Sequence, residues 1–296
     1  MTAQPSLKPV TSATPAPLPA LVYEPILRQA LAEDMGRGGD LTSQLTIPAG
    51  TQASANFVAR ESGTIAGLSM ALRAFSLLDE SLALTPYVQD GDRVTPGTLL
   101  ATVSGDARSI LGAERTALNL LGRLCGIATT TSTMVALLGG THAKLADTRK
   151  TTLGLRALEK YAVRCGGGHN HRMALDDAIM IKDNHIAIAG SLTKAVTAAV
   201  AGAGHMVRIE VEVDTLQQLA ELLTLDGVDV VLLDNMTPAQ LKEAVAMVNG
   251  RLITEASGGV RPETLAAIAA TGVDYISAGF LTHSAPNFDV GLDISL

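Results

Sequence analysis

Seven basic residues lie between Asp147 and His185 and make this stretch a candidate anion-binding site. They are Arg149, Lys150, Arg156, Lys160, Arg164, Arg172 and Lys182. Beyond Asp147 only four acidic residues oppose them, although the whole chain has a net charge of -7 at pH 7. Clustered cations raise the local concentration of anions and steer them toward the protein. A solvated charged face is the ordinary alternative, but it does not explain why three consecutive glycines (166–168) and the sequence Lys-Asp-Asn-His (182–185) fall in the same stretch.

Apolar runs lead up to three of these cations. Residues 143–146 precede Arg149 and Lys150, and residues 178–181 precede Lys182. Short apolar runs of this kind are typical of buried strands. In α/β barrels and open α/β sheets, ligands bind beyond the C-terminal ends of the strands. The three cations are therefore predicted to stand where a strand ends and a ligand binds.

From His142 onward, short apolar runs alternate with helical stretches, a pattern that indicates βαβ units. The predicted strands are 143–147, 178–182, 207–213, 228–233, 251–256 and 274–278. The predicted helices between them are 152–164, 191–202, 215–224, 238–248 and 262–271. Aromatic residues make up only 3% of the chain, so aliphatic side chains must fill the core, as is common where helices pack on a parallel sheet. So many strands in so short a region predict a barrel.

Each predicted strand is followed by polar residues that a turn does not require. They are Asp147, Arg149 and Lys150; Lys182 to His185; Glu210, Glu212 and Asp214; Asp234 and Asn235; Glu255 and Ser257 to Gly259; and Ser277 and Gly279. The two-residue period of a strand puts Glu210 and Glu212 on one face. Two inward carboxylates are costly unless they meet cations or a metal ion. Six such strand ends together predict the mouth of a barrel active site.

The residue types at these strand ends suggest particular ligands. Backbone N–H groups in the glycine-containing segments 257–259 and 278–280 could hold a phosphate. Glu212 and Asp234 could bind Mg²⁺, which prefers carboxylate and phosphate oxygens. The guanidinium groups of Arg149 and Arg172 suit carboxylates. Zinc is not expected, because the few Cys and His residues do not supply enough ligands.

The N-terminal part shows a different organisation. Residues 1–22 are rich in Pro and Ala and are predicted to form a disordered arm. Helices are predicted at 24–34, 67–78 and 108–138, the last with a break near Cys125-Gly126, and strands at 53–66 and between 88 and 103. Sequence pattern alone leaves Arg115, on the long helix, as a surface salt-bridge partner.

Composition excludes some classes of protein. The negative net charge argues against general nucleic-acid binding. No apolar run reaches the roughly 18 residues of a membrane span, so no membrane role is expected. The two cysteines show no pairing or metal-ligand spacing, which favours reduced thiols in a cytoplasmic protein.

Taken together, these motifs resemble quinolinate phosphoribosyltransferase. The resemblance rests on Asp147 to Arg156, Gly166 to Arg172, Lys182 to His185, Glu114 to Asn119, Glu210 to Val213, Leu233 to Asn235 and Ala256 to Gly259. It implies an N-terminal α/β sandwich domain (23–125), an incomplete α/β, TIM-like barrel (126–282) and a C-terminal segment (283–296) that returns to the first domain. The implied reaction joins quinolinate to 5-phosphoribosyl-1-pyrophosphate, giving nicotinate mononucleotide, pyrophosphate and CO2 in NAD biosynthesis. The implied cofactor is Mg²⁺.

The resemblance also assigns roles to residues. It implies that Lys150, Glu212 and Asp234 are catalytic, and that Glu212 and Asp234 hold Mg²⁺ directly or through water; the residues alone leave Glu210 open in place of Glu212. The implied substrate-binding residues are Arg115, Thr148, Arg149, Lys150, His171, Arg172, Lys182, Glu212, Asp234, Ser257, Gly258, Gly259, Ala278, Gly279 and Phe280. A homodimer, or a hexamer built from dimers, is expected, with Arg115 entering the partner's site.

Two other functions remain open at this point. One is a phosphoribosyltransferase that acts on nicotinate, although a monocarboxylate does not require so many cations. The other is a catalytically silent barrel relative that binds anionic metabolites, against which the presence of Lys150, Glu212 and Asp234 argues.

Overall fold

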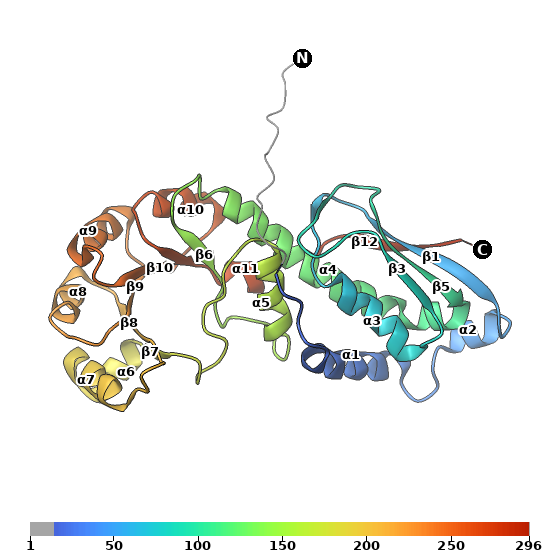
Figure 1. The fold of residues 1–296 in the computed structure, drawn as a ribbon, viewed down its shortest axis with the longest axis horizontal. Coiled ribbons are helices and arrows are strands. Elements are labelled where there is room, and N and C mark those ends of the chain that lie inside the picture. Colours follow the sequence, from blue (N-terminus) through green and yellow to red (C-terminus); the bar gives the residue numbers. More distant parts are fainter. Residues whose placement is uncertain (1–14, 296) are drawn as a thin grey trace, which may run out of the picture.

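The computed structural model describes residues 15–295, which form two parts side by side along the long axis of the molecule (Figure 1). The N-terminal part is built on a four-stranded antiparallel sheet in the order β12-β1-β5-β3. Its strands are β1 (Gln52–Ala59), β3 (Ala83–Pro86), β5 (Leu99–Asp106) and β12 (Val290–Ser295). The last strand of the chain therefore completes the first sheet.

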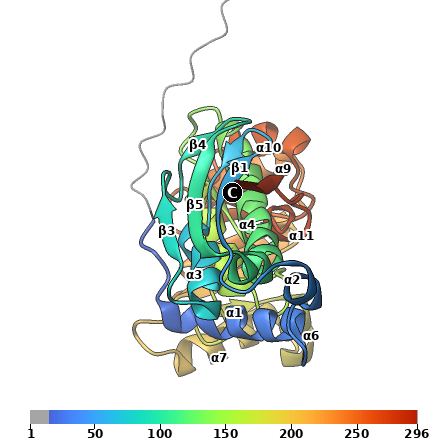
Figure 2. The ribbon, with the colours of Figure 1, turned by 90° about the vertical axis from the view of Figure 1, so that its right-hand side faces the viewer.

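Helices cover one face of this sheet (Figure 2). They are α3 (Leu68–Leu78) and α4 (Ala107–Ala136), with α1 (Ala20–Met35) packed against both. Alternate residues of β1 are buried, as the period of a strand requires, and Phe57 meets Phe75 of α3 edge to face at 5.7 Å. A short helix, α2 (Leu41–Thr46), and a two-stranded sheet of β2 (Gly63–Thr64) and β4 (Arg93–Val94) complete this part. This arrangement is the predicted α/β sandwich.

Three predictions for the N-terminal part are corrected. The single strand predicted at 53–66 is two strands of different sheets, because β1 ends at Ala59 and β2 covers only Gly63–Thr64. The predicted disordered arm reached residue 22, but α1 begins at Ala20, directly after Pro19; residues 1–14 of the arm lie outside the described part of the chain. The predicted break near Gly126 is absent, because α4 runs on to Ala136. A Cβ atom on Gly126 would lie 2.0 Å from the carbonyl oxygen of Pro286. This glycine therefore lets the segment before β12 cross the helix closely.

The C-terminal part is an incomplete α/β barrel. Its six parallel strands lie in the order β6-β11-β10-β9-β8-β7. They are β6 (Lys144–Ala146), β7 (Ile179–Ile181), β8 (Ile209–Val213), β9 (Val230–Asp234), β10 (Ile253–Ser257) and β11 (Tyr275–Ser277). Successive strands are neighbours except β6 and β7, which do not pair with each other within residues 15–295. The ring is therefore broken between these two strands.

Helices surround the ring on the outside, as Figure 1 shows. They are α5 (Arg156–Cys165), α6 (Asp183–Ala189), α7 (Leu192–Gly202), α8 (Leu216–Leu222), α9 (Pro238–Val248), α10 (Pro262–Ala269) and α11 (Phe280–His283). All six predicted strands and the five helices predicted between them are present. The structure adds α6 and α11, which the sequence pattern did not indicate. No single described helix is long and apolar enough to cross a membrane. Helices α6 and α7 together have the length and apolar composition of a span, but the chain bends by 95° between them.

One loop segment lies in the break of the ring. The carbonyl of Leu145 accepts the N–H of His169 at 2.8 Å, and Asp147 donates its N–H to the carbonyl of His169 at 3.0 Å. The other edge of β6 pairs with β11, so this segment occupies the edge that faces β7. It brings His171 and Arg172 to the barrel interior.

Candidate active site

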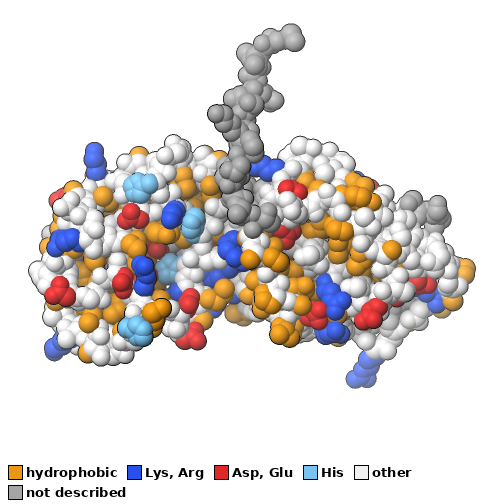
Figure 3. Space-filling model, viewed as in Figure 1, with side chains coloured by type: hydrophobic (Ala, Val, Ile, Leu, Met, Phe, Trp, Pro, Cys, Tyr) orange, Lys and Arg blue, Asp and Glu red, His pale blue; other side chains and the backbone are white. Residues whose placement is uncertain are grey.

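The C-terminal ends of the barrel strands carry most of the predicted site residues. Figure 3 shows Lys, Arg and His side chains gathered on the barrel part of one face, interspersed with Asp and Glu. One of the predicted cations is not free: Lys160 is fully buried and forms an ion pair with Asp147. The anion-binding capacity therefore rests on the remaining cations.

A cavity of about 220 Å³ joins the ends of β6, β10 and β11. It is lined by the predicted residues Thr148, Lys150, Ser257, Gly258, Gly259, Ala278, Gly279 and Phe280, and also by Ser277, Val260, Arg261, His283 and Ser284. The sequence reasoning missed Arg261 and His283. Arg261 precedes a helix as its N-cap residue, so its type and position gave no signal of a cavity.

Glycines shape this cavity. Gly258 has a φ of +88°, and a Cβ atom there would lie 2.1 Å from the side-chain oxygen of Asn235. A Cβ atom on Gly279 would lie 2.9 Å from Cδ of Lys150. The hydroxyl of Thr148 accepts the N–H of Lys150 at 3.0 Å, and Thr282 donates its hydroxyl to the carbonyl of Lys150 at 2.7 Å. The lysine is therefore held beside the glycine-lined wall.

Glu212 and Asp234 stand at the ends of the adjacent strands β8 and β9. Glu212 forms a direct ion pair with Lys182, at the end of β7. Asp234 is partly buried; burial and the nearby charge of Asp214 raise its pKa, while Lys182 and Lys150 oppose the shift. A carboxylate whose pKa is raised in this way would be stabilised by an added cation at the mouth.

A second cavity, of about 500 Å³, is lined by His171, Arg172, Glu210 and Glu255 and extends to the N-terminal ends of the strands, where Val230, Ile253 and Tyr275 line it. His171 meets Glu210 of β8 and Glu255 of β10 there, with its Nε2 atom 3.1 Å from Glu210 and 3.5 Å from Glu255. Burial disfavours the charged ring, but the two acids raise the pKa of His171 overall. The N–H of Arg172 donates to Nδ1 of His171 at 2.7 Å, which holds the ring in the tautomer with its proton on Nε2. In that tautomer Nδ1 accepts a hydrogen bond and Nε2 carries the proton, so neither ring nitrogen offers a free lone pair to a metal ion.

Glu210 was predicted as an inward-facing strand residue and as the alternative to Glu212 at the Mg²⁺ site, and Glu255 as a polar residue at a strand end. The histidine that they share was not foreseen. Burial, then the charge of Glu210, raises the pKa of Glu255 to about 7. Glu210 is the deeper of the two acids on β8 and contacts His171, whereas Glu212 contacts Lys182 nearer the mouth. The structure therefore gives the two glutamates different partners.

The two predicted carboxylate-binding arginines, Arg149 and Arg172, keep side-chain donors that the described residues do not use. The Nη1 atom of Arg172 donates to the carbonyl of Ala178 at 2.8 Å. The Nε atoms of Arg149 and Arg172 are buried and have no hydrogen-bond partner among the described residues. Burial and the neighbouring charge of Arg149 lower the pKa of Arg172. Two guanidinium groups that repel each other and hold unused buried donors are suited to an anion.

Arg115 lies elsewhere. It stands on α4, its side chain is 63% exposed, and its nearest ion-pair partner is Glu114 at 3.7 Å. It lines a separate cavity of about 400 Å³ with Glu33, Asp34 and Arg123. The structure of one chain does not bring Arg115 to its own barrel mouth.

The fold and this site define a class of protein: α/β-barrel enzymes that bind phosphorylated, anionic substrates at their strand ends. Comparison with known proteins identifies the family. Residues 40–125 match the N-terminal domain of quinolinate phosphoribosyl transferase, and residues 127–293 match its C-terminal domain. The chain belongs to the quinolinate phosphoribosyltransferase family.

Individual relatives agree with this assignment. The chain is 46% identical over 276 residues to a nicotinate-nucleotide pyrophosphorylase (carboxylating) of Mycobacterium leprae, covering 90% of this chain and 95% of that protein. It is 42% identical to a mitochondrial quinolinate phosphoribosyltransferase (decarboxylating) of Nicotiana tabacum, covering 93% and 83%. The structure of the nicotinate-nucleotide pyrophosphorylase from Francisella tularensis superimposes with a TM-score of 0.90 at 38% identity, covering 94% and 98%. The predicted fold class and family are confirmed.

Proposed function

We propose that this chain transfers the phosphoribosyl group of 5-phosphoribosyl-1-pyrophosphate to quinolinate, with loss of CO2, to give nicotinate mononucleotide and pyrophosphate. The observation that carries the proposal is the pair of buried, unpartnered Nε donors of Arg149 and Arg172 beside a separate glycine-lined anion cavity at Lys150. Quinolinate has two carboxylates, and the sugar substrate has a phosphate and a pyrophosphate. The site offers a place for each kind of anion.

The bond changes follow from these substrates. The ring nitrogen of quinolinate forms a bond to C1 of the ribose, and the bond from C1 to the pyrophosphate oxygen breaks. The carboxylate next to the ring nitrogen then leaves as CO2. Its electron pair stays on the ring carbon, where the cationic nitrogen stabilises it until that carbon takes up a proton. No separate organic cofactor is needed as an electron sink.

The charged residues of the site match the charges that develop on the substrates during the reaction. Positive charge develops on the ribose as the C1–O bond breaks, and the carboxylates of Glu212 and Asp234 would stabilise it. Negative charge develops on the leaving group, which Lys150 would stabilise from its position at the glycine-lined cavity. Arg149, His171, Arg172 and Lys182 would orient quinolinate, with the guanidinium groups on its carboxylates.

Mg²⁺ fits the mouth as a cofactor. Glu212 and Asp234 supply two carboxylates, and Mg²⁺ is commonly held by one or two carboxylates together with substrate phosphates and water. Burial raises the pKa of Asp234 despite the nearby Lys182 and Lys150, so a bound cation would stabilise its ionised form. When bound there, Mg²⁺ would neutralise charge on the departing pyrophosphate.

We also propose a homodimer with shared sites, either alone or as the unit of a hexamer. Arg115 is exposed and away from its own barrel mouth, so it is free to enter a partner's site. Exposed apolar side chains occur beyond the strand ends at Leu153 and Ile188 and on α2 at Leu41 and Leu45. Contact with a second copy would bury such side chains.

A direct assay tests the reaction. Purified protein is incubated with Mg²⁺, 5-phosphoribosyl-1-pyrophosphate and quinolinate labelled in the carboxylate next to the ring nitrogen. Release of pyrophosphate and labelled CO2 in equal amounts is expected, with no reaction when either substrate is left out. Turnover of nicotinate in place of quinolinate would favour the other phosphoribosyltransferase, and release of neither product would identify a silent relative.

Mixing two variants tests the shared site. Arg115→Ala and Arg172→Ala should each weaken quinolinate binding, by roughly ten- to a hundredfold for a lost charge-assisted contact. In a mixed dimer, one site receives both substitutions and the other receives neither. Random exchange makes half of the dimers mixed, so about a quarter of the wild-type sites should return. Mass spectrometry first confirms that the subunits have exchanged. If activity then does not recover, the shared site is refuted and Arg115 is a surface salt-bridge residue.

A further inference from the structure

Helix α5 carries two adjacent charged residues, Glu159 and Lys160, that are both fully buried. Neighbouring residues on a helix point about 100° apart, so the two side chains cannot face the same group. Burying a charge is costly unless it is paired and hydrogen-bonded. Each of these two residues has partners in one of the two loop segments that carry Arg149 and Arg172.

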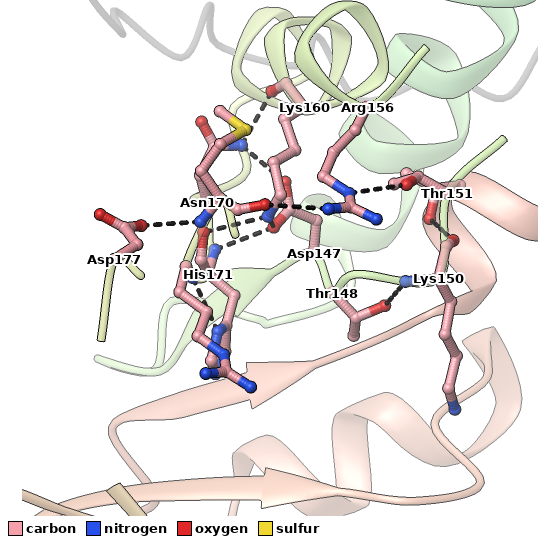
Figure 4. A network of polar contacts seen from close by, with 12 residues as sticks. Asp147, Thr148, Lys150, Thr151, Arg156, Lys160, Asn170, His171 and Asp177 are labelled. Atoms are coloured by element: carbon pink, nitrogen blue, oxygen red, sulfur yellow. Dashed lines mark hydrogen bonds and ion pairs between the residues drawn. The ribbon is translucent and has the colours of Figure 1, made fainter. Parts of the chain in front are cut away.

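Lys160 holds the segment that fills the break in the ring. Its ammonium pairs with Asp147 at the end of β6 and donates to the carbonyl of His171 at 3.0 Å. Asp147 in turn accepts the N–H of His171 at 2.8 Å and the side-chain amide of Asn170 at 2.6 Å. Figure 4 shows Lys160, Asn170 and His171 converging on this carboxylate. Three donors on one buried carboxylate fix the backbone from which Arg172 projects.

Glu159 holds the other loop. Its carboxylate accepts the N–H of Thr152 at 3.1 Å and its hydroxyl at 2.7 Å, which anchors the loop that follows Arg149 and Lys150. The same carboxylate accepts two bonds from Arg123 of α4, at 3.0 and 2.8 Å. Arg123 also donates to the carbonyls of Thr282 and Ala285, close to the glycine-lined wall. Glu159 therefore ties this loop to both α4 and the segment after α11.

We propose that Glu159 and Lys160 are positioning residues, each of which sets the geometry of one loop of the substrate site. Lys160 positions the quinolinate-binding segment 169–172, and Glu159 positions the loop 148–155, which presents Arg149 to quinolinate and Lys150 to the phosphoribosyl substrate. Neither side chain lines the two described cavities of the site, so neither touches substrate. The inference rests on the proposed function, because that function supplies the substrates that the two loops bind.

The test compares the KM values of the two substrates in each variant. Lys160→Met keeps length and apolar volume but removes the donors to Asp147 and His171, so KM for quinolinate should rise roughly tenfold or more while KM for the phosphoribosyl substrate changes little. Glu159→Gln should instead raise both KM values and lower kcat, because the loop that it anchors carries Arg149 as well as Lys150. Thr152→Val, which loses only the hydroxyl bond to Glu159, should shift the same constants less.

A matched control separates positioning from general stability. Glu24→Gln breaks an ion pair of the N-terminal part, with Arg73 at 2.8 Å, that lies outside the site. It should lower the melting temperature and leave both KM values within about twofold of the wild type, because an ion pair away from the site positions no substrate group. Hydrogen exchange should become faster over residues 166–178 in Lys160→Met but not in Glu24→Gln.

A double variant covers the case in which Lys160→Met leaves Asp147 as a lone buried charge and unfolds the protein. Asp147→Leu with Lys160→Met removes both charges, so stability should recover while KM for quinolinate stays raised. Recovery of KM for quinolinate together with stability in the double variant, an equal shift of both KM values in Lys160→Met, or no shift of either in Glu159→Gln would overturn the inference. An inactive wild-type protein would instead overturn the proposed function, which the wild-type assay decides first.

Discussion

Replacing Glu255 with Gln is expected to stabilise the folded protein above neutral pH. Glu255 is only 5% exposed and stands near Glu210, so its pKa is raised from 4.5 to about 7 by burial and then by that neighbouring charge. Ionising the Glu255 carboxyl therefore costs more free energy in the folded protein than in the unfolded chain, where water solvates the charge. At about 1.4 kcal/mol per pKa unit, the difference corresponds to about 3 kcal/mol.

The direction with pH follows from linkage. A group whose folded pKa is raised binds its proton more tightly in the folded state. Its stabilising contribution is complete below the unfolded pKa of 4.5 and is lost as the pH rises through about 7. The amide of Gln does not titrate, so Glu255→Gln should remove this part of the pH dependence.

Urea unfolding followed by circular dichroism from pH 5 to pH 9 measures the effect. The wild type should lose about 2–3 kcal/mol relative to Glu255→Gln across this range, most of it between pH 5 and pH 7, where the unfolded carboxyl is ionised and the folded one still holds its proton. Glu243→Gln, on the exposed face of α9, removes a carboxylate that is not buried and should leave the wild-type curve unchanged in shape. Parallel curves for the wild type and Glu255→Gln would refute the reasoning, because they would mean that Glu255 is not protonated in the folded state.

Three further predictions follow. Gly126→Ala should lower the free energy of unfolding by about 1–3 kcal/mol in urea melts, because its Cβ would meet the carbonyl of Pro286, whereas Gly202→Ala on α7 meets no atom within 4 Å and should not. Asp234→Asn should lower turnover far more than quinolinate affinity; a calorimetric loss of quinolinate binding alone would contradict this. Cys125 and Cys165 are buried and burial raises the pKa of both thiols, so a thiol reagent should label neither in the native protein and both after unfolding.

Much of the barrel could be predicted because its signals are local. The strands are short apolar runs whose outward residues, such as Val211 and Val213, pack against helices, and the polar residues that follow them mark the mouth. Helix α9 has the predicted bounds, and in the structure Thr237 and Gln240 form a capping box at its start, with Pro238 in the first turn. In contrast, α6 has no buried residue among its seven, so it left no apolar stripe in the sequence.

The contacts within the site could not be predicted because they join distant parts of the chain. Lys160 was counted with the anion-binding cations, but it faces Asp147 inside the protein. Nothing in the sequence around His171 indicates that Glu210 and Glu255 are its partners. The spacing of residues in the sequence shows which side chains share one face of a strand. Which side chains meet across the ring depends on how the strands are staggered relative to one another, as for His171 with Glu210 and Glu255. The family resemblance supplied roles for residues but not these contacts.

The break between β6 and β7 explains why such a ring holds a polar site. In a closed eight-stranded barrel, layers of side chains fill the interior. Here the missing pairing leaves a cavity of about 500 Å³ and admits the segment of His171 and Arg172 from the side. An inserted loop has no ladder of strand hydrogen bonds to fix it, so its position must be set by side chains. The buried ion pair of Asp147 and Lys160 supplies this anchor, since both residues hydrogen-bond to the inserted segment. A charged pair therefore stands at the place where a closed barrel would have a further strand.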